Sequence, residues 1–452
     1  MRMHTILALA VAGGLCAAAP AADAVPYTLS ASAAKRQPAP ALHSFAAAVR
    51  DGKWLLIGGR TNGFHRTSKP ESTFPSKFSN EYIHVVDPVR DVAWKVGIPE
   101  KYRLRLRTTN MAYYQDGDVL YLVGGYGSKS DADAEGDYQT FPNLTAVRVA
   151  QIIAAVTAGN QDQVEAAITS IEDERMRVTG GGLQKLGDTF YLVFGQNYDK
   201  MYKGAVTGKY TNEVRRFKIQ LGANSLAISD YEAITDPNGS GPDSQFHRRD
   251  LNVAPAIRPD GTPGINVYGG VFTKTGSAWV NPVSIDQDAT GKAAVVVDTK
   301  FEQKMCQYDA ARATLFDPAT KTMYTSILGG ITLYYYNKDG ALEESNLNNF
   351  MPFTGAITTL ARAAAGTTTE VPQPADQGLP GYLGSDAVFI PLDGLPRVAK
   401  APDVLDYSKL PAGDKVLIGH LYGGIRSSAE QVNGFNPSFA SNTIYEVYLQ
   451  RK

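Results

Sequence analysis

The stretch Arg50-Asp51-Gly52-Lys53-Trp54-Leu55-Leu56-Ile57-Gly58-Gly59 contains a turn, a short apolar run and a pair of glycines. Asp51-Gly52 supplies the positive φ angles that a tight hairpin turn needs. Residues 54–57 are bulky and apolar, which predicts a strand buried on both faces. Gly58-Gly59 ends this strand without side chains, so another backbone can approach it closely.

This unit recurs along the chain, and an Asn before a strand-like run follows most copies. Further copies occupy residues 115–125, 185–196, 258–270, 317–330 and 412–424. The third copy ends in Phe194-Gly195-Gln196, from which we predict that Gln196 replaces the second glycine. Six copies of one supersecondary unit predict six structural repeats within a single domain.

The repeats resemble those of the kelch β-propeller family, in which a glycine pair is followed by a spaced Tyr and Trp. The first copy has all of these residues, Gly58-Gly59, Tyr82 and Trp94, whereas the other copies keep the glycines better than the aromatic residues. The resemblance implies an all-β fold, a six-bladed propeller, over residues 25–452. It says little about chemistry, because one fold carries many functions.

Residues 1–24 have the features of a secretory signal peptide. Arg2 and His4 precede an apolar stretch, and Ala22-Asp23-Ala24 fits a small-x-small cleavage site. The apolar stretch is short for a bilayer span, although a retained membrane anchor is the alternative. We therefore expect a secreted bacterial protein, periplasmic or extracellular, with no membrane span after cleavage.

The two ends of the chain predict how the ring closes. The last repeat ends just after its third strand, and residues 27–30 form a spare extended segment at the N-terminus. A propeller removes exposed sheet edges by closing its ring. We expect residues 27–30 to become the outer strand of the last blade. In the second blade, residues 149–156 and 164–167 predict a short helical insertion, with Asn160 as a possible cap.

Composition excludes several classes of partner and site. The formal net charge is −1, so no global field attracts nucleic acid. Only Cys306 lies beyond the signal segment, which excludes an internal disulfide and a cysteine-based zinc site. The chain lacks P-loop, HExxH and G-x-S-x-G motifs, and we expect no metal and no cofactor.

The loops that lead into the first strand of each blade carry most of the candidate binding residues. They emerge on the same face as the links between strands two and three. Arginine forks suit carboxylates or phosphates, and tyrosines suit sugar rings or peptides. The candidate ligand-binding residues are Arg60, Arg107, Arg177, His247, Arg248, Arg249, Tyr308 and Asp386. The alternative is that these arginines pair with Asp250, Asp309 and Asp386 and only brace the ring.

These features predict a binding module whose partner is an anionic small molecule, a glycan or a protein. One alternative is a carbohydrate-active enzyme of the mutarotase or epimerase class acting on an anionic sugar, since the chain is similar to secreted six-bladed sialic-acid epimerases. Another is a structural partner in a cell-envelope complex. Kelch-type copper oxidases need a Tyr-His pair, which this sequence lacks.

Overall fold

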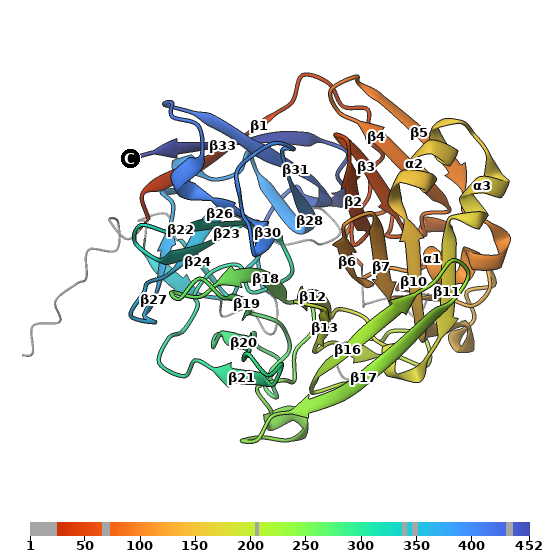
Figure 1. Cartoon of the computed structure of the whole chain (residues 1–452), viewed down its shortest axis with the longest axis horizontal. Coiled ribbons are helices and arrows are strands. Elements are labelled where there is room, and N and C mark those ends of the chain that lie inside the picture. Colours follow the sequence, from red (N-terminus) through yellow and green to blue (C-terminus); the bar gives the residue numbers. More distant parts are fainter. Residues whose placement is uncertain (1–24, 66–72, 204–207, 337–340, 346–350, 431–436) are drawn as a thin grey trace, which may run out of the picture.

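The structure is a computed structural model, and it describes residues 25–65, 73–203, 208–336, 341–345, 351–430 and 437–452. The predicted signal segment, residues 1–24, lies outside the described residues. The described chain forms six sheets arranged around a central axis, each built on four antiparallel strands (Figure 1). This is the predicted all-β, six-bladed β-propeller.

Each blade runs from an inner strand at the axis to an outer strand at the rim. Blade one is β2 (Ala46–Arg50), β3 (Lys53–Ile57), β4 (Tyr82–Asp87) and β5 (Val92–Gly97). Blade two is β6 (Ala112–Asp116), β7 (Val119–Val123), β10 (Asn143–Arg148) and β11 (Ile168–Glu172). Blade three is β12 (Gly182–Leu186), β13 (Thr189–Val193), β16 (Glu213–Leu221) and β17 (Leu226–Thr235).

The second half of the chain builds the other three blades. Blade four is β18 (Asn252–Ile257), β19 (Pro263–Tyr268), β20 (Val283–Gln287) and β21 (Ala293–Val297). Blade five is β22 (Ala311–Asp317), β23 (Thr322–Ile331), β26 (Phe353–Arg362) and β27 (Thr368–Pro372). Blade six is β28 (Tyr382–Pro391), β31 (Val416–Ser427), β33 (Ile444–Arg451) and β1 (Tyr27–Ala33).

Short elements decorate the links between the main strands. The helices are α1 (Arg103–Leu106), α2 (Val149–Thr157) and α3 (Gln161–Ala166). Small strand pairs are β8 (Tyr126–Ser128) with β9 (Tyr138–Thr140), β14 (Gln196–Asn197) with β15 (Lys209–Tyr210), and β24 (Tyr334–Tyr336) with β25 (Leu342–Glu344). A further strand, β32 (Ser438–Ala440), pairs with β31.

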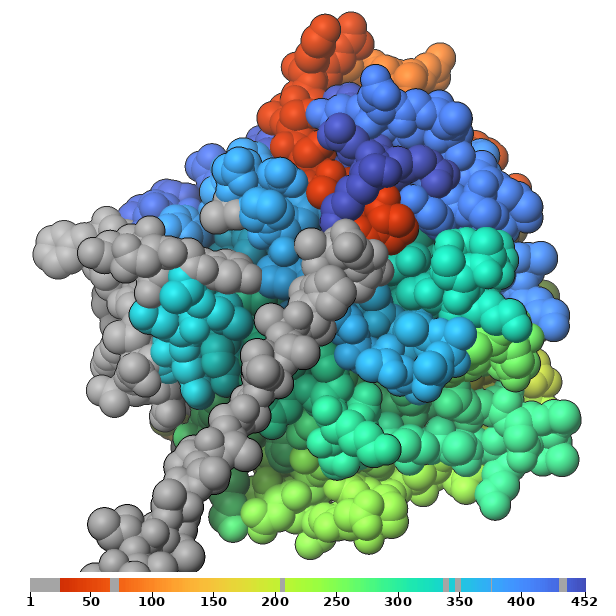
Figure 2. Space-filling view, turned by 90° about the vertical axis from the view of Figure 1, so that its left-hand side faces the viewer, coloured from red at the N-terminus to blue at the C-terminus, as the bar shows by residue number. Residues whose placement is uncertain are grey.

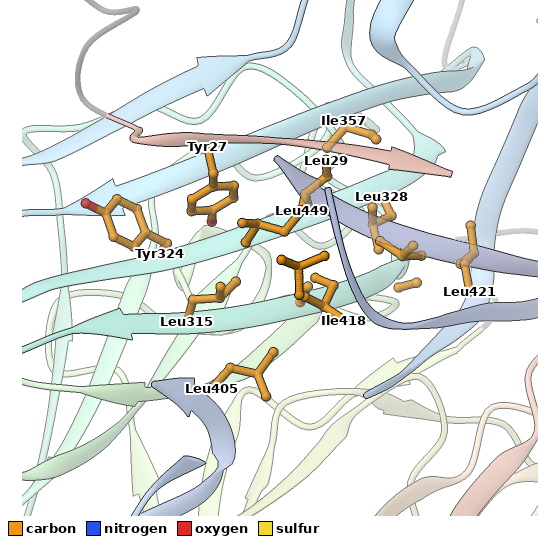
Figure 3. Close-up of a cluster of buried hydrophobic side chains, with 14 of the residues drawn as sticks. Tyr27, Leu29, Leu315, Tyr324, Leu328, Ile357, Leu405, Ile418, Leu421 and Leu449 are labelled. Atoms are coloured by element: carbon orange, nitrogen blue, oxygen red, sulfur yellow. The ribbon is translucent and has the colours of Figure 1, made fainter. Parts of the chain in front are cut away.

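The N-terminal strand closes the ring as predicted. Strand β1 pairs antiparallel with β33, from Tyr27 opposite Arg451 to Ala33 opposite Tyr445. The first and last parts of the chain accordingly lie side by side on the surface (Figure 2). The inner side of β1 is buried among strands of blades five and six, where Tyr27 and Leu29 lie near Leu449 (Figure 3). The outer edge of blade six is therefore built from the opposite end of the chain.

The predicted helical insertion of blade two is also present. Helices α2 and α3 lie between β10 and β11, and the side chain of Asn160 accepts a hydrogen bond from the Gln163 N–H at 3.1 Å. This contact makes Asn160 the N-cap of α3. Ile152, Val156 and Val164 are fully or almost fully buried, so the insertion extends the hydrophobic core between blades one and two.

The glycine pairs follow strand two in blades one, two and four, and they lie inside the longer strands β23 and β31 in blades five and six. The prediction for blade three is wrong. Gly59 and Gly125 donate to the carbonyls of Thr108 and Val178 in the next blade, both at 2.8 Å. Gly195 makes the matching bond to Arg248 O at 2.8 Å and has φ +91°. Gly195 is therefore the second glycine of this copy. The lost glycine is the first one, replaced by Phe194 at φ +55°.

The long link between β28 and β31 contains a hairpin that the sequence did not reveal. Strands β29 (Arg397–Val398) and β30 (Ala401–Asp406) belong to the link inside blade six but join the sheet of blade five. The contact is a short parallel pairing in which Leu405 lies opposite Leu315 of β22. This hairpin sits at the end of the axis opposite to the loops that lead into the inner strands.

The hydrophobic core is divided into clusters between adjacent blades. Trp54 and Tyr422 join blades one and six, and Tyr121 and Phe190 join blades two and three. Equivalent clusters fill the other blade interfaces. Because the blades pack through these clusters, side chains at the axis are held by a rigid frame.

Candidate binding site in the axial channel

Six residues, one near the start of each inner strand, form a ring of backbone around the propeller axis. We call it the axial ring, and its members are Ser44, Asn110, Gly180, Asp250, Asp309 and Asp386. Five of the six neighbouring pairs are joined by N–H to carbonyl bonds of 2.7–3.2 Å, in each of which a ring residue donates to the ring residue of the preceding blade. The ring ties all six blades together at one end of the axis.

The backbone of the axial ring explains its unusual composition. Asn110, Asp250 and Asp386 have φ of 52°, 48° and 53°, Ser44 has 54° and Gly180 has 65°. Among residues with a side chain, Asn and Asp adopt this left-handed region most readily. A backbone requirement thereby brings polar side chains to the axis.

A channel extends from the axial ring along the inner strands. Two adjoining cavities, of about 280 and 140 Å³, share Met111, Tyr113, Asp309, Arg312 and Phe389 in their walls. We call their combined space the axial channel. Residues from all six inner strands line the larger cavity, and at its far end Arg397, Asp403 and Leu405 of the β29–β30 hairpin contribute. The axial channel thus runs from the axial ring to this hairpin.

An ion pair between Arg312 and Asp309 is the main charged feature of the channel wall. Nη1 of Arg312 donates to Asp309 Oδ1 at 2.5 Å and also to Asn252 Oδ1 and the Ala310 carbonyl. Within the described residues, Nε and Nη2 have no protein acceptor. The two side chains lie deep in the propeller, yet 27% of the Arg312 surface and 40% of the Asp309 surface face open space. These polar groups are therefore available to a ligand.

Tyr113 and Asp386 complete the polar surface next to this pair. Burial raises the pKa of Tyr113 to about 12, and within the described chain its hydroxyl bonds to no protein group. Burial, with the carboxylates of Asp309 and Asp250, raises the pKa of Asp386 well above its usual range. Such a shift favours the protonated acid, which can donate as well as accept a hydrogen bond.

On the other side of the axial ring lies a buried polar network. Arg249 donates to the Tyr202 hydroxyl at 3.0 Å and pairs with Asp250 at 3.2 Å. The Tyr308 hydroxyl donates to the same Asp250 carboxylate at 2.9 Å. Tyr202 also belongs to a buried aromatic cluster with Phe74, Tyr126, Tyr138 and Tyr198. Among the described residues, the polar atoms of Arg249, Asp250 and Tyr308 thus bond to other groups of the network.

Half of the predicted binding residues lie close to the axis. Three of them influence one another electrostatically at the axial ring: Arg249, Tyr308 and the ring member Asp386. Arg60 lies nearby: its Nη2 donates to the Pro75 carbonyl at 3.0 Å, and its guanidinium covers the Phe74 ring. Only Asp386 of these four also lines the axial channel. Whether any of them binds a ligand stays a prediction.

The other four predicted residues lie away from the axial channel and contact protein. Arg107 pairs with Glu81 at 2.8 Å and with Asp131 at 2.5 Å. Arg177 pairs with Glu174 at 2.6 Å. His247 stacks on Tyr210, with ring centroids 3.8 Å apart, and Arg248 donates to the Gln245 and Gly269 carbonyls. These side chains have protein partners, as the bracing alternative requires, but the partners are not the predicted Asp250, Asp309 and Asp386.

Arg248 allows a direct test of bracing. Its side chain is fully buried, makes three hydrogen bonds and stacks on Trp279. Arg248→Ala leaves buried acceptors unpaired, so we expect a loss of about 2–4 kcal/mol in unfolding free energy. Urea denaturation of the wild type and the variant measures this loss. Lys274→Ala, which removes an exposed ion pair with Asp243, serves as the control and is expected to cost below about 1 kcal/mol. Equal losses in the two variants would contradict the bracing role.

Sequence reasoning missed the residues that face the channel, chiefly Tyr113, Gln184 and Arg312. All three lie within inner strands and not in the loops before them. One signal was present: Arg312 interrupts the otherwise apolar start of the run Ala311-Arg312-Ala313-Thr314-Leu315-Phe316. A charged residue in a buried strand requires a partner or a function.

Comparison with known proteins gives no relative: no family model and no curated protein matches this chain. Within the described residues, no three His, Cys, Asp or Glu side chains are grouped closely enough to hold a metal ion. In the same part of the chain, no helix has the length and apolar character needed to cross a bilayer. The function of the protein must therefore be derived from the residues around the propeller axis.

Proposed function

We propose that this protein is a binding module that takes up a small polar molecule in the axial channel. The observation that carries the proposal is the presence of unpaired polar groups of Arg312 and Tyr113 in a channel walled by all six blades. Concave sites with a few converging polar groups on a rigid scaffold are typical of ligand binding. The Arg249 guanidinium, by contrast, is already held by Tyr202 and Asp250.

The cellular setting of this proposal follows from the sequence. We propose that residues 1–24 direct export and that the mature chain works in the periplasm or outside the cell. The six-fold repeat and the ring closed by β1 support a propeller related to the kelch type.

An acid–base enzyme is the second candidate, and one observation favours it. Asp309 and Asp386 are neighbours in the axial ring and both line the channel, but only Asp309 has an arginine partner. Two carboxyl groups in unlike environments can serve as base and acid. The left-handed backbone of Asp386 already explains an Asp at that position without catalysis, so binding remains the primary proposal.

The proposal is tested by a thermal-shift screen of small polar metabolites on the mature protein and on channel-filling variants. Ala47→Phe and Gln184→Phe place a ring into the channel from two different blades. Ala93→Phe on the exposed side of β5 is the matched control. We expect compounds that stabilise the wild type to stabilise the control equally and to lose their effect on both filling variants. A ligand that stabilises the filling variants as strongly as the wild type would refute the channel site.

A further inference from the structure

We infer that the ligand of the axial channel is an uncharged polyol of monosaccharide size, with its hydroxyl groups held by Arg312 and Asp309. This inference rests on the proposed binding function and specifies the class of molecule. It departs from the anionic ligand that the arginine-rich loops predict, because Arg312, which faces the channel beside the axial ring, already has a carboxylate partner.

The arginines of the channel wall each lie beside an aspartate, and the remaining aspartate, Asp386, is in a buried environment that favours its uncharged form. These pairs disfavour a charged ligand. Arg312 is paired with Asp309, and at the far end Arg397 lies in the electrostatic field of Asp403. An anion near Arg312 would also approach Asp309 and Asp386, and a cation near Asp309 would approach Arg312. A net charge brought into this enclosed space would lose its hydration without gaining an unpaired opposite charge.

Hydrogen-bond donors and acceptors lie next to each other in the channel wall, and this arrangement matches the hydroxyl groups on neighbouring carbons of a sugar. Arg312 offers Nε and Nη2 as donors, and the adjacent Asp309 carboxylate, whose side chain is 40% exposed, is an acceptor. A hydroxyl group can both donate and accept, so two vicinal hydroxyls can satisfy the guanidinium and the carboxylate at the same time. The Tyr113 hydroxyl also donates and accepts, and so does Asp386 in the protonated form that its burial favours.

Apolar rings supply the second element that a sugar needs. Tyr113 and Phe389 are shared by the walls of both cavities, and Tyr114 lines the larger one. Aromatic faces suit the C–H faces of a sugar ring. A cavity of about 280 Å³ lies just under the usual range for sites of drug-sized ligands, roughly 300–1,000 Å³. The space fits one sugar ring better than an oligosaccharide.

The β29–β30 hairpin restricts the channel at its far end. The Tyr114 hydroxyl of blade two donates to Asp403 of the hairpin at 2.9 Å, although the hairpin is attached to the sheet of blade five on the other side of the ring. This contact spans the end of the channel, so a polymer chain cannot thread through it without displacing the hairpin. The arrangement favours a small, enclosed ligand.

The experiment compares sugars that share a ring but differ in charge. The mature protein is titrated calorimetrically with three sets of compounds, one set each for the gluco, galacto and manno configurations. Each set contains the neutral sugar, its uronate and its amino sugar. We expect at least one neutral sugar to bind at least ten-fold more tightly than its uronate and its amino sugar. Tyr113→Phe is expected to weaken that binding about ten-fold while the melting temperature stays unchanged.

Removing the carboxylate partner of Arg312 should reverse the preference. In Asp309→Asn the guanidinium lacks its counter-charge, so the uronate of the same configuration is expected to bind more tightly than the neutral sugar. Glu302→Gln, which removes a carboxylate from an exposed pair with Lys304, is the control and should leave the preference unchanged. If Asp309→Asn does not fold, the Tyr113→Phe titration still tests the site.

The possible outcomes separate the two proposals. Tighter binding of a uronate or an amino sugar to the wild type, abolished by the channel-filling variants, would overturn the uncharged ligand and leave the binding function intact. No binding of any sugar, together with a different ligand from the metabolite screen, would have the same consequence. Binding that the channel-filling variants do not affect would overturn the channel as the site.

Discussion

Removal of residues 25–33 is expected to destabilise the propeller more than any single substitution. These residues contain β1, which forms the outer edge of blade six. Val25, Tyr27 and Leu29 are buried, and each contributes about 1.5–3 kcal/mol by burial. The Gln373 side chain also bonds to both the N–H and the carbonyl of Leu29. The summed loss, on the order of 6 kcal/mol, is comparable to the whole stability of many domains.

Differential scanning calorimetry of the mature and the truncated chains measures this effect. We expect the truncated protein to melt at a far lower temperature or to show no cooperative transition. A synthetic peptide of residues 25–35 added to the truncated chain is expected to restore part of the stability, because the edge of β33 is then paired again. A fall of less than about 2 °C, which corresponds to about 1 kcal/mol or less, would contradict closure by β1.

Gly195→Val is expected to be the most damaging point substitution in blade three. A Cβ at this position would lie 2.5 Å from Val178 Cγ2 and 2.9 Å from the Thr179 carbonyl oxygen. The φ of +91° is a conformation that β-branched residues avoid. Steric overlap and backbone strain together predict a loss of about 4 kcal/mol or more in unfolding free energy, or failure to fold.

The control separates crowding from the backbone angle. Gly187 also has a positive φ, +60°, but a Cβ there would meet only the Gln287 side chain at 3.8 Å. Gly187→Ala should therefore cost only the left-handed backbone penalty of about 1–2 kcal/mol. Gln196→Gly tests the corrected alignment: we expect no gain in stability, since Gln196 does not occupy the glycine position. A stability gain in Gln196→Gly, with Gly195→Val tolerated, would restore the original alignment.

The fold was largely predictable because each repeat carries its own local signals. The Asp51-Gly52 turn has φ of 51° and 73°, as a tight hairpin turn of this type requires, and the glycine pairs mark the close contacts between blades. The glycine pair of the other copies can be matched in the third copy either to Phe194-Gly195 or to Gly195-Gln196, because each of these contains one glycine. The alignment predicted from the sequence was therefore wrong. Only the contact with Arg248 O decides between them. The β29–β30 hairpin was missed because it pairs with another blade.

The candidate site was less predictable for a physical reason. A loop arginine such as Arg107 looks available in sequence, yet its partners Glu81 and Asp131 come from two other segments of the chain. The channel residues Tyr113 and Arg312 belong to no motif, and blades two and five bring them together. Which groups remain unpaired depends on tertiary packing, which the sequence alone does not reveal.

The most direct test of the central claim is a crystal structure of the mature protein with the neutral sugar that binds best in the titrations. We predict electron density for one sugar ring in the axial channel, between Tyr113 and Arg312, with hydroxyl groups within hydrogen-bond distance of Arg312 and Asp309. Density on the opposite side of the axial ring, beside Arg249 and Tyr202, would contradict the account and place the ligand at the loop face.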